Sequence, residues 1–314
     1  MNRRAIITSI KGTKLSTKEK ALIKKYKPWG IIIFKRNIET FTQLKHLINS
    51  IKKCMNDPNY PVLIDEEGGP VSRLSDIYYN RMFSQRFFGE LYSKNKKVAL
   101  SLYQKYLDHL SRKLKELNIN INTIPVLDLL HSKTHKFLSQ RSFSTKVATI
   151  EALGKFCVSV SKRNKIAAVV KHFPGHGLST VDSHYKLPVI NENLKFLVNN
   201  DFKCFKNSSA LFAMTGHILI KALDKDNCIT FSKQGLFYLR KKLKFKGLII
   251  SDDISMKALP GNYLTNSQKA LAAGCNLSLY CAGNTKESEN LLKITPYIDS
   301  FTIKKTKQFY NFLR

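Results

Sequence analysis

The sequence of 314 residues has no long hydrophobic run and no break that would divide it. The apolar stretch from Ala5 to Ile10 is interrupted by Thr8 and Ser9 and followed by Lys11, so it is too short for a signal peptide or a membrane span. The chain also has no linker, low-complexity segment or internal repeat. We therefore expect one domain over residues 1–314, located in the cytoplasm, with no membrane partner.

Cysteine is scarce, and its spacing does not indicate metal binding. None of the cysteines forms a C-x-x-C pair, and a chain of this length without an export signal is expected to keep its thiols reduced. The spacing supports neither a zinc knuckle nor a disulfide framework. The six cysteines are Cys54, Cys157, Cys204, Cys228, Cys275 and Cys281.

Acidic residues are scarce as well, with 22 Asp and Glu against 53 Lys and Arg, for a net charge of +31. Such a charge invites a nucleic-acid interpretation, because basic clusters bind phosphate backbones. However, the lysines are scattered through predicted helices such as 18–27, 94–97 and 241–246, and no Gly/Arg-rich or aromatic-interleaved tract is present. We predict no direct nucleic-acid binding, but a surface that attracts small anionic substrates.

Short apolar runs alternate with lysine-rich amphipathic stretches along the whole chain, which is typical of parallel β/α units. The predicted helices include 17–26 with Ser16 as a cap, 42–53, 96–117, 147–162 and 233–243. The predicted strands are 5–8, 30–34, 62–65, 121–126, 166–170, 211–214, 248–250 and 277–280. Eight units, with 43% hydrophobic residues, predict a single (β/α)8 TIM barrel of the α/β class. The alternative is a doubly wound open sheet, but no G-x-G-x-x-G follows the first strand.

A cluster of ionisable residues follows the predicted strand 166–170. It comprises Lys171-His172-Phe173-Pro174-Gly175-His176-Gly177 and then Asp182-Ser183-His184. In parallel α/β proteins, ligands bind at the carboxyl ends of the strands. This segment therefore predicts an active-site loop.

Other strand ends carry polar residues that are weak signals one by one. Asp65 to Arg73 could be a charged surface loop, Arg141 a surface arginine, and His217 a structural histidine. Adjacent strand residues point to opposite faces, so we expect only one of Asp252 and Asp253 to face the pocket. On one barrel rim these side chains would form a pocket of Asp65, Arg73, Arg141, Lys171, His172, Asp182, His184, His217 and Asp252.

Such a pocket can hold sugar hydroxyls in pairs. It also offers a carboxylate nucleophile and an imidazole with a partner acid, which are the groups needed for double-displacement glycoside cleavage.

The sequence resembles the β-N-acetylhexosaminidases of glycoside hydrolase family 3, in particular the compact bacterial type that acts in peptidoglycan recycling. The resemblance lies in Trp29 to Asn37, the acidic Gly-Gly loop from Asp65 to Leu74, and Lys171 to Gly177 followed by Asp182-Ser183-His184. Ser251 to Met256 is similar to the family's nucleophile motif, and Gly274-Cys275-Asn276 completes a match over nearly the whole chain.

The resemblance implies a retaining exo-β-N-acetylglucosaminidase that releases terminal N-acetylglucosamine from muropeptides, as a monomer without metal or other cofactor. Asp252 would be the nucleophile and His184 the acid/base, with Asp182 orienting His184. The residues that would hold the sugar are Asp65, Arg73, Arg141, Lys171 and His172.

The chain departs from the family pattern at three places. Glu66 stands where the family has Gln or His, Pro70 replaces an arginine, and Ser139-Gln140 replaces a Gly-Asp pair. None of these positions is assigned to chemistry or to sugar contact, so the departures concern the loop shapes and the way the leaving group is held.

Three alternatives stay open. Phosphate could replace water as the acceptor on the same scaffold. A metal-dependent amidohydrolase would use His172, His217 and Asp252, but it needs a His-x-His pair on the first strand, where this chain has Thr8-Ser9-Ile10. A non-catalytic sugar-binding barrel is disfavoured because the catalytic trio is intact.

Overall fold

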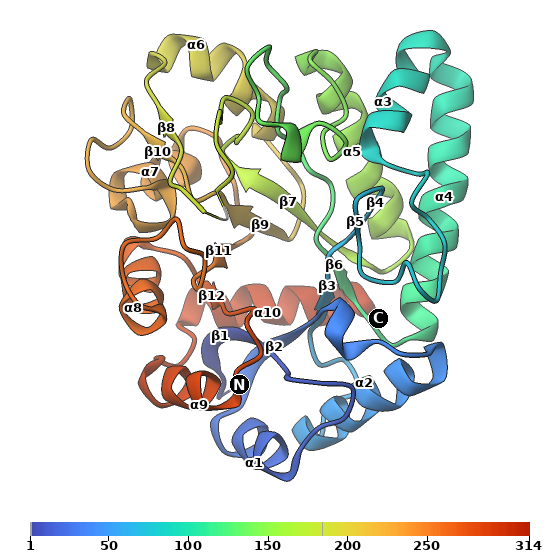
Figure 1. The fold of residues 1–314 in the computed structure, drawn as a ribbon, viewed down its shortest axis with the longest axis vertical. Coiled ribbons are helices and arrows are strands. Elements are labelled where there is room, and N and C mark those ends of the chain that lie inside the picture. The colour runs from blue at the N-terminus through green and yellow to red at the C-terminus, as the bar shows by residue number, and fades with distance from the viewer. Residues whose placement is uncertain (1, 184) are drawn as a thin grey trace.

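Eight parallel strands form a closed barrel in a computed structural model that describes residues 2–183 and 185–314 (Figure 1). Every strand predicted from the sequence corresponds to one barrel strand, so the predicted (β/α)8 barrel is confirmed. In barrel order the strands are β1 (Arg4–Ser9), β12 (Leu277–Leu279), β11 (Leu248–Asp253), β9 (Phe212–Thr215), β7 (Ala167–Phe173), β6 (Ile121–Asn122), β3 (Val62–Ile64) and β2 (Pro28–Ile33).

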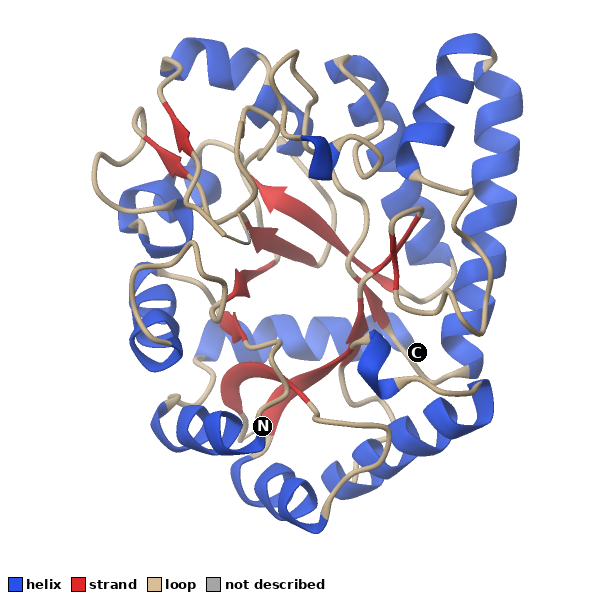
Figure 2. Ribbon diagram, in the orientation of Figure 1, coloured by secondary structure: helices blue, strands red, loops and turns tan. Residues whose placement is uncertain are grey.

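Helices surround the strands on the outside (Figure 2). The predicted cap of the first helix is confirmed, because Ser16 Oγ accepts from Glu19 N at 3.2 Å in a capping box. None of the helices in the described residues is long and apolar enough to cross a membrane. The helices are α1 (Thr17–Tyr26), α2 (Phe41–Met55), α3 (Gln85–Lys94), α4 (Lys96–Glu116), α5 (Val147–Arg163), α6 (Leu194–Asn199), α7 (Lys233–Lys241), α8 (Tyr263–Ala273), α9 (Thr285–Ile294) and α10 (Ser300–Leu313).

Two small sheets decorate the loops. A hairpin of β4 (Glu66–Gly68) and β5 (Val71–Ser72) follows β3, and β8 (Val189–Ile190) pairs with β10 (Leu219–Ile220). Both sheets lie outside the barrel, in the segments that follow β3, β7 and β9.

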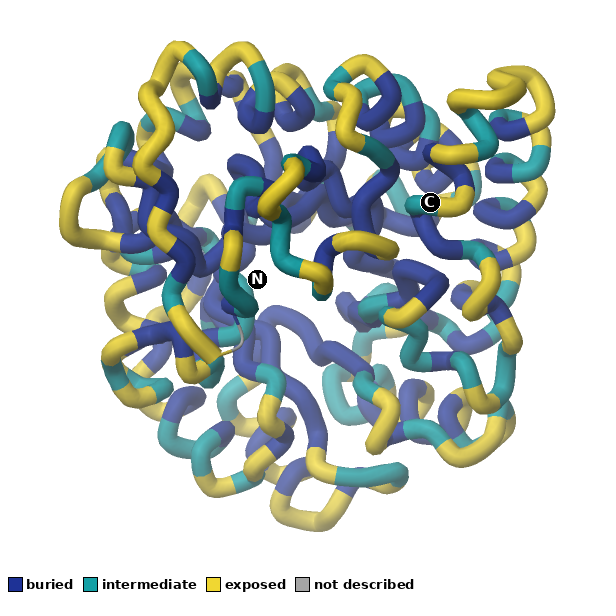
Figure 3. The backbone as a smooth tube through the Cα atoms, turned by 45° about the horizontal axis from the view of Figure 1, so that its top comes forward, coloured by how far each residue is buried: buried dark blue, intermediate teal, exposed yellow. Residues whose placement is uncertain are grey.

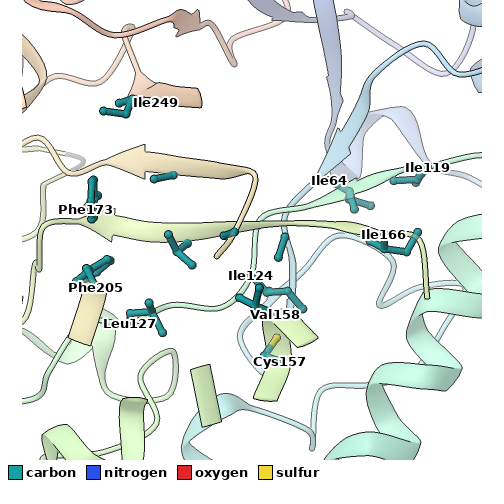
Figure 4. Close-up of a cluster of buried hydrophobic side chains, with 14 of the residues drawn as sticks. Ile64, Ile119, Ile124, Leu127, Cys157, Val158, Ile166, Phe173, Phe205 and Ile249 are labelled. Atoms are coloured by element: carbon teal, nitrogen blue, oxygen red, sulfur yellow. The ribbon is translucent and has the colours of Figure 1, made fainter. Parts of the chain in front are cut away.

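The strands are buried on both faces, which explains why they read as continuous apolar runs. In β7, Ala167 and Val169 belong to the inner cluster that fills the barrel, whereas Ala168 and Val170 belong to the outer cluster under the helices. Figure 4 shows part of that outer cluster, and Figure 3 shows the buried strands enclosed by helices with exposed outer faces.

Helix α10 closes the amino end of the barrel, and in Figure 1 it lies behind the strands. Its Phe309 packs against Trp29 and Phe212 with ring centroids 6.2 and 5.5 Å away. Trp29 Nε1 donates to Thr306 Oγ1 at 2.9 Å, so the one polar atom of this buried ring has a partner. The opposite, carboxyl end of the barrel is surrounded by the loops that follow the strands.

One predicted strand is too long. The prediction placed a strand over 121–126, but β6 ends at Asn122. The Asn122 side chain accepts from Glu66 N and donates to Glu66 O, both at 3.0 Å, and Pro125 has no N–H to donate to a ladder. Side-chain bonds and a proline therefore interrupt the strand after Asn122, and pairing with β7 returns as an isolated bridge between Val126 and Lys171.

Candidate active site

A cavity of about 310 Å³ lies at the carboxyl end of the barrel. Six of the predicted pocket residues line it, namely Asp65, Arg73, Arg141, Lys171, His172 and Asp252. The remaining lining residues are Phe34, Glu67, Val71, Phe137, Ser183, Met214, Asp253, Met256, Leu279 and Cys281. Charged groups and apolar side chains thus share the wall, which is the composition of a site for a small polar molecule.

Asp65 connects two of the predicted sugar-binding cations. Its Oδ2 lies 3.0 Å from Arg73 Nη2, its Oδ1 lies 3.4 Å from Lys171 Nζ, and Thr123 donates to it as well. Burial by itself raises the pKa of Asp65, but Lys171 and Arg73 outweigh burial and hold the pKa well below its usual range. Asp65 is therefore a fixed anion that can accept hydrogen bonds from hydroxyls.

Glu67 joins the other half of this network, and the sequence analysis did not assign it. Its carboxylate accepts Arg141 Nε and Nη2 at 2.9 Å each, and Lys171 Nζ lies 2.6 Å away. The side chain is only 1% exposed. Burial disfavours its charge, but Arg141 and Lys171 lower the pKa of Glu67 to about 2. The bidentate contact fixes the plane of the Arg141 guanidinium.

The hydrogen bonds of His172 assign its tautomer. Arg141 Nη2 lies 3.2 Å from His172 Nε2, and because a guanidinium can only donate, Nε2 is the acceptor. The proton therefore sits on Nδ1, which donates to Asp128 Oδ2 at 2.7 Å. Burial raises the pKa of Asp128, but His172 more than offsets that and lowers it. The sequence analysis noted Asp128 at a strand end without giving it a role.

These contacts form one continuous series, which we call the ion-pair chain. It runs from Arg73 through Asp65, Lys171, Glu67, Arg141 and His172 to Asp128. Its members come from the β3–β5 segment, the loops after β6, and β7. All five residues predicted to bind the sugar belong to it.

His176 lies behind His172 and is 1% exposed. Its ring meets His172 and Phe137 edge-on at 5.6 and 5.5 Å, and neither ring nitrogen has a hydrogen-bond partner among the described residues. Burial, together with the neighbouring His172, lowers the pKa of His176 to about 4. His176 is therefore neutral at physiological pH.

Asp252 and Asp253 both line the cavity, so the expectation that only one would face it is wrong. The reason is a register shift in β11 between Ile250 and Asp253, which breaks the strict alternation of side chains. Their surroundings nevertheless differ. The Asp253 carboxylate accepts from Ser255 Oγ at 2.8 Å and from the backbone N–H groups of Ser255 and Cys281 at 3.1 Å each, and burial raises its pKa.

His217 does not line the cavity, contrary to the prediction. It is fully buried, with Nδ1 2.8 Å from Thr230 Oγ1 and Nε2 2.9 Å from the carbonyl oxygen of Asp253. Its ring braces the backbone beneath the two aspartates. The sequence could not distinguish this role, because a histidine at a strand end fits either role equally well.

The predicted catalytic loop is described in part. Ser183 lines the cavity, whereas Asp182 is half-buried and its backbone carbonyl accepts from Tyr185 N and Lys186 N. The predicted acid/base, His184, lies outside the described residues. The loop therefore reaches the cavity within one residue of His184 in the sequence.

The three departures from the family pattern lie away from the cavity lining. Glu66 is buried and accepts from Leu74 N at 2.8 Å and Asn80 Nδ2 at 2.6 Å, so it ties the acidic loop together. Pro70 is exposed at the turn of the β4–β5 hairpin. Gln140 accepts from Ser84 Oγ at 3.2 Å. All three act on loop shape.

Residues 2–183 and 185–314 contain no group of three or more His, Cys, Asp or Glu side chains that could hold a metal ion. The two histidines that an amidohydrolase would use are engaged elsewhere, His172 with Asp128 and Arg141, and His217 with Thr230 and the Asp253 carbonyl. The described side chains therefore offer hydroxyl-binding and carboxylate chemistry.

Comparison with known proteins agrees with this architecture. A curated relative from Glaesserella parasuis serovar 5, named beta-hexosaminidase, is 32% identical over 282 residues, which cover 88% of this chain and 80% of the relative. Another of the same name from Psychromonas ingrahamii is 31% identical over 315 residues, covering 98% and 89%. The solved structure of NagZ from Neisseria gonorrhoeae in complex with N-trifluoroacetyl-D-glucosamine has a TM-score of 0.88 at 24% identity, covering 100% of this chain and 90% of that one.

The family profile described as the glycosyl hydrolase family 3 N terminal domain matches residues 5–306. This match takes in the barrel strands, the ion-pair chain and both aspartates of β11. The chain therefore belongs to glycosyl hydrolase family 3 and is a glycoside hydrolase.

Proposed function

We propose that this protein is a retaining exo-β-N-acetylglucosaminidase with Asp252 as its nucleophile. The observation that carries the proposal is that Asp252 lines the same cavity as a fixed set of hydroxyl-binding charges. Relatives named beta-hexosaminidase support the choice of an N-acetylated sugar. Asp65, Arg73, Arg141, Lys171 and His172 would hold that sugar.

Asp252 is a better candidate than Asp253 because of what surrounds each carboxylate. Both Asp253 oxygens are tied to Ser255, and one also accepts from the backbone N–H of Cys281, so attack would have to break the loop that these bonds hold. Asp252 Oδ1 accepts from Asp253 N at 2.8 Å, a contact with the backbone that does not involve Ser255 or Cys281. The bonds that hold Asp253 in place favour Asp252 as the nucleophile that attacks the anomeric carbon.

In the first step Asp252 attacks the anomeric carbon, and His184 as imidazolium gives its proton to the departing oxygen. The bond to the leaving group breaks as the glycosyl ester forms. In the second step neutral His184 takes a proton from water, and the resulting attack releases the sugar and restores the Asp252 carboxylate. Two inversions give net retention.

Asp182 would orient His184 and stabilise its imidazolium form. The pair lies in the loop after β7, of which Ser183 reaches the cavity. Because a neutral imidazole does not repel an anionic acceptor, phosphate is the natural competitor of water in the second step.

The natural substrate in this proposal is a peptidoglycan fragment with a terminal N-acetylglucosamine. The enzyme would work in the cytoplasm as a monomer, and residues 1–314 would form one catalytic domain. We propose that it needs no metal or other cofactor.

The test is incubation of the pure protein with an aryl β-N-acetylglucosaminide, with and without phosphate, and identification of the sugar product. We expect free N-acetylglucosamine of retained configuration, and the same rate in the presence of a chelator. A sugar 1-phosphate would replace hydrolase by phosphorylase. Loss of activity with EDTA and its return with zinc would overturn the proposal.

A further inference from the structure

A cavity of about 370 Å³ lies at the amino end of the barrel, away from the active site. Its walls are the loop before β9, the loop before β11 and helix α10. The volume is within the range of small-molecule sites, so this cavity can hold a ligand of its own. The lining residues are Asn207, Ser208, Ser209, Ala210, Leu211, Lys244, Lys246, Gly247, Lys305 and Gln308.

The charges that line this cavity all have one sign. Lys244, Lys246 and Lys305 contribute three ammonium groups, and none of the described lining residues is Asp or Glu. In the described part of the chain, no ion pair involves any of these three lysines. The cavity therefore offers positive charge that the protein does not pair with acids of its own.

Lys305 shows that the positive charges are close enough to repel one another. Its Nζ donates to Gln308 Oε1 at 3.2 Å, and this partner is neutral. Burial, together with the charges of Lys304, Arg240 and Lys246, lowers the pKa of Lys305. An anion bound in the cavity would relieve this repulsion.

Only the first of the lysines between 241 and 246 lies on a helix, contrary to the expectation from the sequence. Helix α7 ends at Lys241, and Lys244 has a left-handed backbone with a φ of 56°. Lys244 and Lys246 therefore lie in the loop before β11, and both are exposed. Their ammonium groups are accessible to a ligand.

The loop before β11 is itself held in place. Arg240 donates to the carbonyl oxygen of Phe245 at 3.3 Å and also to that of Gly247. A Cβ at Gly247 would lie 2.4 Å from the carbonyl oxygen of Leu211, so the loops before β9 and β11 touch each other there. Because these contacts already fix the backbone, binding of an anion would cost little further ordering of the loops.

We propose that this cavity binds a small polyanion that carries a diphosphate group. Lysine ammonium groups bind phosphate oxygens as point charges, and the hydroxyls of Ser208 and Ser209 can donate to further oxygens. A single phosphate group carries about −1.5 to −2 charges, which is fewer than three lysines can compensate, whereas two linked phosphate groups match them better. The site lies at the end of the barrel away from the catalytic loops, so the ligand stabilises the fold and takes no part in glycoside cleavage.

Non-specific attraction is the competing explanation, because a net charge of +31 attracts any polyanion. The two explanations predict different behaviour. A site saturates at one ligand per chain and depends on the lysines that line it. Non-specific attraction depends on the net charge, wherever on the surface that charge is changed.

The test measures binding of inorganic diphosphate to the pure protein by titration calorimetry, in metal-free buffer at constant ionic strength. We expect one ligand per chain, and binding of inorganic phosphate that is weaker by at least about tenfold. Lys246→Glu should raise the Kd on the order of tenfold or more, because it reverses a charge that contacts the ligand. Lys244→Glu should act in the same way, whereas Lys246→Arg should keep the Kd within about threefold, since a guanidinium also binds phosphate.

The matched control is Lys97→Glu, which changes the net charge equally at an exposed lysine of α4 outside the cavity lining. It should bind diphosphate as the wild type does. Diphosphate should also raise the urea midpoint of the wild type and of Lys97→Glu, but not that of Lys246→Glu. Without ligand the three midpoints should agree, which separates loss of binding from loss of folding.

Equal weakening in Lys97→Glu and Lys246→Glu would identify attraction by net charge and overturn the site. Binding of diphosphate that does not saturate, or equal affinity for single phosphate, would overturn the assignment of the ligand. Single-stranded RNA or anionic vesicles that bound through Lys246 where diphosphate did not would replace the small ligand by a macromolecular one. Binding is measured without a glycoside, so none of these outcomes depends on the proposed function.

Discussion

The two ends of the barrel are closed by opposite chemistry. At the carboxyl end, Lys171 and Glu67 are 3% and 1% exposed, and their charges are compensated by other charges of the ion-pair chain. At the amino end, Trp29, Phe212 and Phe309 pack ring against ring beneath α10. Burying ion pairs gives little net stability, whereas burying aromatic rings gives much. The comparison teaches that this fold keeps its stability at one end and its chemistry at the other.

The largest expected effect concerns Asp252. If the carboxyl end of the barrel serves chemistry and the amino end serves stability, a substitution of Asp252 should change activity and not stability. Asp252→Asn should lower kcat by roughly a thousandfold or more, because no carboxylate remains to form the glycosyl ester. The urea midpoint should stay near the wild-type value. Both are measured on the same preparation, with an aryl glycoside and by urea unfolding.

Asp253→Asn is the matched comparison for that experiment. Its carboxylate holds Ser255 and the Cys281 backbone, so the variant should lose stability as well as rate. A slow fluorinated glycosyl substrate should label Asp252 in the wild type. A label on Asp253 would reverse the assignment of the pair.

At the amino end, Phe309→Ala should show the opposite pattern. Removing a fully buried phenylalanine costs about 4 kcal/mol of unfolding free energy, because a cavity is left among the rings. The kcat of the folded enzyme should change by less than about twofold, since α10 lies at the end of the barrel away from the cavity. A large loss of kcat at full folding would show that the two ends are coupled, and the comparison would fail.

Glu67→Gln tests the carboxyl end of the barrel in the same way. It leaves Arg141 and Lys171 buried with one anion fewer, which we expect to cost about 3 kcal/mol of stability, as for a broken buried pair. Unlike Phe309→Ala, it should also raise KM, because Arg141 loses the bidentate contact that orients it. Urea unfolding and steady-state kinetics measure the two effects.

Glu66→Gln, one residue earlier, is the control for that change. Glu66 is buried too, but it ties Leu74 and Asn80 and lies outside the cavity lining. Its substitution should leave KM unchanged. Equal KM values for the Glu67 and Glu66 variants would contradict a role of Glu67 in holding the site.

The fold could be predicted from the sequence because most of the barrel strands contain a short apolar run that is buried on both faces. The extent of the strands was less predictable. Strand β6 stops at Asn122 because its side chain bonds to the Glu66 backbone, a contact between residues 56 positions apart. No local pattern contains such a contact.

The site residues that belong to a sequence motif could be predicted, whereas a residue whose role depends on a distant contact partner could not. Lys171, His172 and Asp252 were found from their places at strand ends. Glu67 was missed because its importance lies in Arg141, which is 74 positions away. One signal was present, since Asp65 and Glu67 are two residues apart, as side chains on one face of a strand are.

His217 and the Asp252–Asp253 pair show the limit of that reasoning. A histidine at a strand end was expected in the cavity, but its two ring nitrogens are used by Thr230 and the Asp253 backbone. Alternation of side chains failed in β11 because the strand shifts register there. Both errors arise where the regular strand ends, which is also where the site begins.

The smallest expected effect is the pH dependence of stability contributed by His176. Its pKa is lowered to about 4 in the folded protein by burial and by His172, against 6.5 in an exposed histidine. Between these values the unfolded chain binds the proton and the folded protein does not, so this contribution to stability is lost as the pH falls from about 6.5 toward 4. At pH 5 the loss should be roughly 2 kcal/mol relative to pH 7.5. His176→Gln should remove this part of the pH dependence in urea unfolding, whereas His46→Gln, at an exposed histidine of α2, should keep it. If His176→Gln lost as much stability in acid as the wild type, the loss would have to come from the ion-pair chain instead of His176. The carboxyl end of the barrel would then contribute even less stability, relative to the aromatic rings at the amino end, than proposed above.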